Sequence, residues 1–152
     1  MWRPLAVTLI GLVLALTVGS ASAGSDSNLR AARAFVRAKG CGTPDASMWM
    51  HGSTFNALFG NCRAGDGHDQ QVWFFAGRRF VRTDARRSSK EVIGVWRDGD
   101  TIAFLYVLYR RDDPNCCPTG GGRIVRFRWN GSHVVALDRL PRRQDGSIAV
   151  GR

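Results

Sequence analysis

The sequence predicts a mostly β protein of the α+β class, built as an antiparallel β-meander of about six strands. One N-terminal helix is expected to pack on one face of the sheet, and disulfide bonds are expected to staple the fold. Three observations lead to this prediction: paired apolar runs joined by short turns, one amphipathic stretch near the N-terminus, and four cysteines. A composition of 44% hydrophobic and 10% aromatic residues is sufficient for a buried core.

Residues 28–39 predict the helix. Ser and Asp residues suited to capping precede this stretch, and Gly40 follows it as a natural helix end. Its apolar residues recur at the three- and four-residue spacing of one helix face: Leu29, Ala32, Phe35 and Val36. Residues 41–67 have no clean period and predict a strand or irregular segment that buries Trp49 and Phe59. This Cys41–Cys62 segment and the helix are expected to cover one face of the sheet together.

Three hairpins are predicted after this segment, over residues 71–83, 92–109 and 123–137. The second and third contain Asp98-Gly99 and Asn130-Gly131, which are strong turn signals because type I′ turns need positive φ at both central positions. Each dipeptide is therefore expected at the centre of its turn.

The residues around these turns predict how the strands pair. A turn at Asp98-Gly99 would set Arg97 opposite Asp100 and make residues 102–109 a central strand, apolar on both faces. In the third hairpin one face is expected to carry apolar residues: Val125, Phe127, Trp129, Val134 and Ala136. The opposite face is expected to carry Arg126, Arg128, His133 and Val135.

The N-terminus predicts export from the cytoplasm. Arg3, an apolar run over residues 5–18 and the A-x-A site Ala21-Ser22-Ala23 are typical of a cleaved secretory signal peptide, residues 1–23. The apolar run is shorter than the roughly 20 residues that a spanning helix needs. Residues 24–152 are then expected to form a single exported domain without a transmembrane segment.

Export makes disulfides the expected state of the four cysteines. Four cysteines allow three pairings, and sequence alone does not choose between them. Local geometry favours bridges from Cys41 and Cys62 to the adjacent Cys116 and Cys117, because a bridge between neighbours needs a distorted peptide. The spacing fits neither a zinc site nor a thioredoxin-like centre, so no metal and no cofactor are expected.

The formal net charge of +10 favours anionic partners. Four arginine pairs lie far apart in the sequence and would form a binding surface only if they converge in space: residues 78–79, 86–87, 110–111 and 142–143. The predicted contact surfaces are the face with Arg126, Arg128 and His133, and the Cys116–Gly122 loop with Pro118 and Thr119. The expected partner is an anionic envelope component or another exported protein.

Catalysis has weaker support in the sequence. Asp66 and His68 lie in a polar, glycine-rich stretch of the kind that forms turns, and His51 has only a nearby Ser53. The chain contains one Glu and no suggestive carboxylate pair. A non-catalytic binding domain is therefore predicted. The alternatives are an inhibitor of an exported protein acting through the Cys116–Gly122 loop, and a small enzyme that uses His68 and Asp66.

Two segments resemble a known family. Residues 113–141, DPNCCPTGGGRIVRFRWNGSHVVALDRLP, and residues 72–85, VWFFAGRRFVRTDA, are similar to the LppP/LprE lipoproteins of the actinobacterial envelope. The resemblance implies an envelope or secreted protein of unassigned function. The family name also implies a lipid-modified cysteine after the signal. Because Gly24 follows Ala23, secretion without a lipid anchor is predicted.

Overall fold

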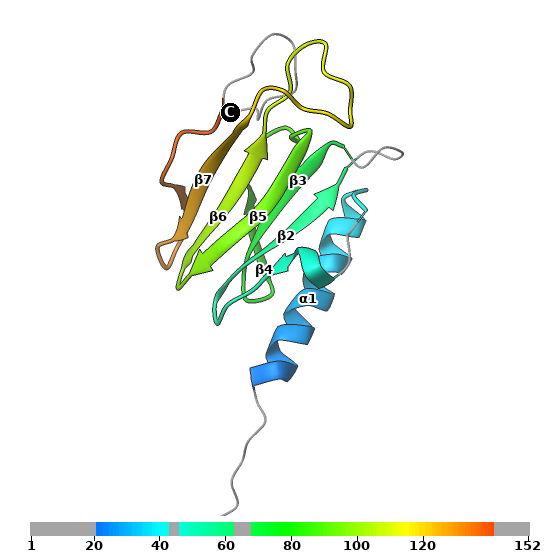
Figure 1. The fold of residues 1–152 in the computed structure, drawn as a ribbon. Coiled ribbons are helices and arrows are strands. Elements are labelled where there is room, and N and C mark those ends of the chain that lie inside the picture. Colours follow the sequence, from blue (N-terminus) through cyan, green and yellow to red (C-terminus); the bar gives the residue numbers. More distant parts are fainter. Residues whose placement is uncertain (1–20, 43–45, 63–67, 142–152) are drawn as a thin grey trace, which may run out of the picture.

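The computed structural model describes residues 21–42, 46–62 and 68–141, and Figure 1 shows how they are arranged. One helix, α1 (Ala21–Ala38), and a short 3-10 helix (Ala46–Met48) precede the strands. The strands are β1 (Trp49–Met50), β2 (Phe55–Asn61), β3 (Gln70–Ala76), β4 (Arg79–Thr83), β5 (Glu91–Asp98), β6 (Thr101–Val107), β7 (Gly122–Trp129) and β8 (Val134–Ala136).

The predicted single meander is wrong in its layout, although the mostly β class and the one helix are confirmed. The eight described strands form two antiparallel sheets of four, in the orders β1-β2-β3-β4 and β5-β6-β7-β8. Residues 84–90 carry the chain from the first sheet to the second, so β4 and β5 do not pair. Each sheet keeps consecutive strands adjacent, as hairpin connections require.

The main core lies between the two sheets. It includes Phe55 and Phe74 from the first sheet and Phe104 and Phe127 from the second, each with at most 1% of its surface exposed. A second cluster lies on the other side of the first sheet, where Ala32 and Val36 of α1 pack against it. The layers are therefore helix, first sheet and second sheet, and α1 lies far from β7 in Figure 1.

Strand β2 is buried on both faces, which explains why residues 41–67 show no clean period. Phe59 points into the core between the sheets, and Leu58 points toward the helix. Gly60 lets the helix approach, because a Cβ there would lie 2.9 Å from Cγ1 of Val36. The predicted burial of Trp49 and Phe59 is confirmed, but this segment forms β1 and β2 rather than a cover over the sheet.

Helix α1 begins at Ala21, earlier than the predicted start at residue 28. In the added stretch, the Ser27 hydroxyl donates a hydrogen bond to the Gly24 carbonyl at 3.0 Å. Residues 1–20, most of the predicted signal peptide, lie outside the described residues. Among the described residues, no helix is long and apolar enough to cross a membrane.

The predicted hairpin pairs are confirmed as β3–β4, β5–β6 and β7–β8, but the second turn lies one residue later than predicted. Asp98 pairs with Thr101, so Gly99 and Asp100 form the turn. Gly99 has a φ of +50° at the first turn position, where a type II′ turn favours glycine. Arg97 therefore does not face Asp100, and its Nη2 donates instead to the Gly99 carbonyl at 2.6 Å.

The predicted disulfide pairing is wrong. The bridges are Cys41–Cys62 and Cys116–Cys117. Backbone hydrogen bonds in both directions between Gly42 and Asn61, at 2.8 and 2.9 Å, place their neighbours Cys41 and Cys62 side by side. The adjacent cysteines lie exposed in the β6–β7 loop, whereas Cys41 is 5% exposed beneath the helix. The favoured bridges between these two regions are therefore absent.

Candidate functional site

The β6–β7 loop, residues 108–121, lies at one end of the second sheet (Figure 1). Its base is closed by two backbone hydrogen bonds: Leu108 N–H donates to the Gly121 carbonyl at 2.8 Å, and Gly120 N–H donates to the Leu108 carbonyl at 2.9 Å. A side chain at Gly120 would collide with the Leu108 carbonyl, so the close approach requires glycine. The glycine run after the cysteines thus closes the loop.

Asp113 braces the interior of the loop. Its carboxylate accepts hydrogen bonds from Arg110 N–H at 2.7 Å, from Thr119 N–H at 2.7 Å and from the Thr119 hydroxyl at 2.6 Å. The Thr119 hydroxyl, followed by these backbone donors, holds the pKa of Asp113 below its usual value. Thr119, predicted as a contact residue, thus holds the loop in shape, while Pro118, Cys116 and Cys117 are exposed.

Replacing Asp113 should loosen the loop without unfolding the sheets. In Asp113→Ala, the amides of Arg110 and Thr119 lose their shared acceptor, so we expect their hydrogen exchange to be several-fold faster. The amide of Leu105 in β6 serves as the internal control and should exchange as in the wild type. Unchanged exchange at Thr119 would contradict the bracing role of Asp113.

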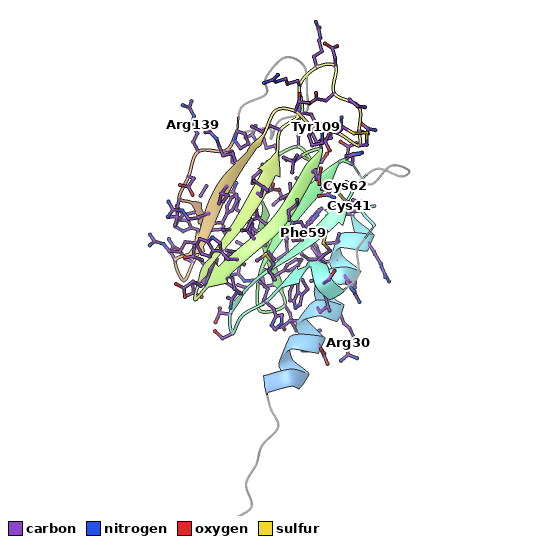
Figure 2. The ribbon with its side chains drawn as sticks, viewed as in Figure 1. Arg30, Cys41, Phe59, Cys62, Tyr109 and Arg139 are labelled. Carbon is purple, nitrogen blue, oxygen red and sulfur yellow. A yellow bond between two sulfur atoms is a disulfide. The ribbon has the colours of Figure 1, made fainter. Side chains whose placement is uncertain are left out.

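Tyr109 anchors the loop to the second sheet. The side chain is 5% exposed, and its hydroxyl lies within donating distance of Glu91 Oε2, at 2.7 Å, and of the Asn115 carbonyl, at 3.1 Å. Burial, followed by the neighbouring Glu91 carboxylate, raises the pKa of Tyr109 to about 12, so the hydroxyl keeps its proton. The Lys90 ammonium lies 4.0 Å from the ring centroid. Figure 2 labels Tyr109 at the base of the loop.

Basic side chains gather at this end of the molecule. Two of the four arginine pairs lie at this end, because Glu91 at the start of β5 pairs with Val107 at the end of β6, and the Gln70–Ser89 bridge holds the preceding residues at the same end of the first sheet. We use the name loop end for the β6–β7 loop together with the basic residues at this end of the molecule. These basic residues are Arg86, Arg87, Lys90, Arg110, Arg111 and Arg123. The pair at residues 78–79 lies at the opposite end, in the β3–β4 hairpin, and residues 142–143 lie outside the described residues.

Asp112 of the loop is exposed, but three other carboxylates at the loop end are held by internal hydrogen bonds. Glu91 accepts from Tyr109, Asp113 accepts from Thr119, and Asp69 accepts from the Ser88 hydroxyl at 3.2 Å. The arginines of the loop end, in contrast, are exposed. The loop end therefore presents more positive than negative charge to solvent.

Of the three residues predicted to form a basic face, Arg126 is paired with a carboxylate. Arg126 is held by Asp138, with distances of 2.8 Å from Nε to Oδ2 and from Nη2 to Oδ1. This pairing lowers the pKa of Asp138 to about 2 and raises that of Arg126. Arg128 is exposed on the same side of β7, whereas His133 lies in the β7–β8 turn next to Asn130.

The two candidate catalytic histidines lie at opposite ends of the first sheet. His68 lies at the loop end, with Nδ1 3.3 Å from the Lys90 carbonyl oxygen, and Asp66 lies outside the described residues. His51 packs near Trp49 at the opposite end of the first sheet. Within the described part of the chain, no three His, Cys, Asp or Glu side chains are grouped so that they could hold a metal ion.

Fold and surface together define a small, disulfide-bonded two-sheet protein with a braced, basic loop end. Residues 56–132, just over half of the chain, match the model of the LppP/LprE lipoprotein family, and the chain belongs to this family. The match runs from β2 to the β7–β8 turn and so includes the β6–β7 loop. Family membership indicates an envelope or extracytoplasmic location. No curated protein and no solved structure matches the chain.

Proposed function

We propose that this protein is an exported, non-catalytic binding domain whose loop end binds an anionic component of the cell envelope. The observation that carries the proposal is that the exposed Arg86 and Arg87 lie at the same end of the molecule as Arg110 and Arg111 of the braced loop. A preorganised loop loses little conformational freedom on binding, so more of the charge attraction is available as affinity. Lipid headgroups and charged wall polymers are partners of the required sign.

The proposal can be tested with vesicles that contain phosphatidylglycerol. The wild type should sediment with these vesicles at low salt, and much less with vesicles of phosphatidylcholine alone. Raising the salt to about 0.5 M should release it, because screening weakens exposed charge attraction. Each arginine near an anionic surface contributes about 1 kcal/mol, so Arg110→Ser/Arg111→Ser should weaken binding about thirtyfold.

The matched control removes the same charge elsewhere. Arg30 and Arg78 are exposed and lie away from the loop end, so Arg30→Ser/Arg78→Ser should weaken vesicle binding much less. Equal losses in the two double variants would show that only net charge matters and would contradict a defined site. Equal binding to both kinds of vesicle would contradict an anionic lipid partner, and a soluble wall polymer would then be tested in the same way.

The bracing of the loop favours a second candidate, an inhibitor or modulator that presents the loop to another exported protein. The exposed Cys116–Cys117 bridge and Pro118 would then be the contact. Such binding should be insensitive to salt and should be lost in Cys116→Ser/Cys117→Ser. Anionic vesicle binding should survive this change, because the arginines remain.

A further inference from the structure

The second sheet has an uncovered face. One face packs on the first sheet, and the opposite face, which we call the outer face, is exposed. The described residues include five large hydrophobic side chains that are exposed, and all five belong to the second sheet or directly follow it: Ile93 (44%), Val95 (45%), Trp96 (40%), Ile124 (49%) and Leu137 (37%). Exposed apolar side chains that adjoin one another mark an interaction surface more often than scattered ones do.

The strand register arranges the outer face in rows that run across β5, β6 and β7. The first row is Ile93, Leu105 and Ile124. The second row is Trp96, Ala103 and Arg126. The third row is Asp98, Thr101 and Arg128. Residues paired across strands share a face, so each row is a line of neighbouring side chains.

A twofold rotation can place each row of one copy opposite the same row of a second copy, with complementary side chains facing each other. If two copies stack outer face to outer face about an axis close to parallel to β6, then β5 of one copy lies over β7 of the other. Ile93 then meets the second copy's Ile124, and Leu105 meets its own counterpart. In the third row Asp98 meets the second copy's Arg128, so opposite charges face each other twice.

We propose that the outer face binds a second copy of this chain and so forms a twofold symmetric dimer. In the second row the same rotation places Trp96 over the second copy's Arg126, the geometry of a cation–π contact. The charges on the face are balanced, because Asp98 and Asp138 offset Arg126 and Arg128. Because the outer face is apolar and its charges balance, it suits a second copy of the chain better than a polyanion. A polyanion is attracted more strongly by the basic loop end.

The size of the face sets the expected affinity. Strands of seven or eight residues span about 25 Å, and four strands span about 19 Å, which gives roughly 500 Å² of projected area per copy. This is at the lower end of specific interfaces, so we expect a dimer that dissociates in the micromolar range, on the order of 10–100 μM. The net charge of +10 on each copy also keeps the dimer weak.

Sedimentation equilibrium tests the proposal on the full domain, at concentrations from about 1 to 500 μM, which bracket the expected dissociation constant. The wild type should show a concentration-dependent monomer–dimer equilibrium. The variant Ile124→Asp places a carboxylate in the interface at two symmetric positions, so the affinity of the dimer should fall about a hundredfold. A thermal unfolding midpoint close to that of the wild type shows that the variant is folded.

A charge exchange tests the register of the two copies. Asp98→Arg and Arg128→Asp should each weaken the dimer about tenfold, since like charges then meet twice, and the double variant should regain wild-type affinity. Arg30→Asp is the matched control, since Arg30 is exposed on α1, on the far side of the first sheet, and it should leave the dimer intact. A wild type that stays monomeric at the highest concentration would overturn the proposal, and so would a double variant that remains as weak as the single ones. Vesicle binding through the loop end is measured separately and does not depend on this result.

Discussion

Removal of the Cys41–Cys62 bridge should lower the free energy of unfolding by about 3 kcal/mol. The bridge joins residues 21 positions apart and ties the end of α1 to the end of β2, so it restrains a long loop of the unfolded chain. The variant Cys41→Ala/Cys62→Ala should therefore unfold on the order of 10 °C lower than the wild type. Chemical denaturation monitored by tryptophan fluorescence measures the difference.

The second bridge provides the matched control. Cys116 and Cys117 are neighbours in sequence, so their bridge closes almost no loop of the unfolded chain. Both are exposed, and Cys116→Ala/Cys117→Ala should change the free energy of unfolding by less than about 0.5 kcal/mol. Equal losses in the two double variants would contradict the assignment of the stabilising role to Cys41–Cys62.

A large pH effect is expected from Asp84, which lies between the two sheets and is 1% exposed. Its carboxylate accepts from the Val72 amide at 3.1 Å and from the Tyr106 hydroxyl at 2.8 Å. Burial outweighs these hydrogen bonds and raises the pKa of Asp84 from 3.8 to about 6. Burial also keeps the pKa of Tyr106 well above its usual value, so Tyr106 remains the donor.

The folded protein therefore holds a proton on Asp84 between pH 3.8 and about 6, where the unfolded chain has lost it. The contribution of Asp84 to stability is greatest below this window and falls as the pH rises through it, by about 3 kcal/mol in total. Asp84→Asn keeps an acceptor for Val72 and does not titrate. The difference in unfolding free energy between wild type and variant should thus shift by about 3 kcal/mol across the window in favour of the variant.

Urea unfolding of both proteins at several pH values from about 3.5 to 7.5 measures this difference. The contributions of titratable groups that both proteins share cancel in the difference. Tyr106→Phe removes the donor that lowers the pKa of Asp84, so in that variant the window should extend to higher pH. Parallel curves for the wild type and Asp84→Asn would show that the carboxylate titrates normally and would contradict its burial between the sheets.

Local patterns in the sequence predicted the hairpins well, because a hairpin depends on residues close in the chain. The alternation of Val125, Phe127 and Trp129 placed these side chains in the core, and all three are buried. The separation into two sheets depends instead on residues 84–90, which cross from one sheet to the other rather than turning back. Nothing in the local pattern distinguishes a long hairpin connection from such a crossing.

The errors in the disulfides and in the candidate site have the same origin. The Gly42–Asn61 bridge that brings Cys41 to Cys62 joins distant parts of the chain and leaves no local signal. The sequence placed Arg126 on an exposed strand face but could not show that Asp138 neutralises it. The loop end was predicted only in part, since the placement of two arginine pairs at one end of the molecule depends on the crossing between the sheets.

Hydrogen exchange with and without phosphatidylglycerol vesicles tests whether the loop end is the binding site. On vesicle binding we expect slower exchange in residues 108–121 and 86–90, with little change in α1 or in the β3–β4 hairpin. Protection confined to α1 and the first sheet, with the β6–β7 loop unaffected, would contradict binding at the loop end.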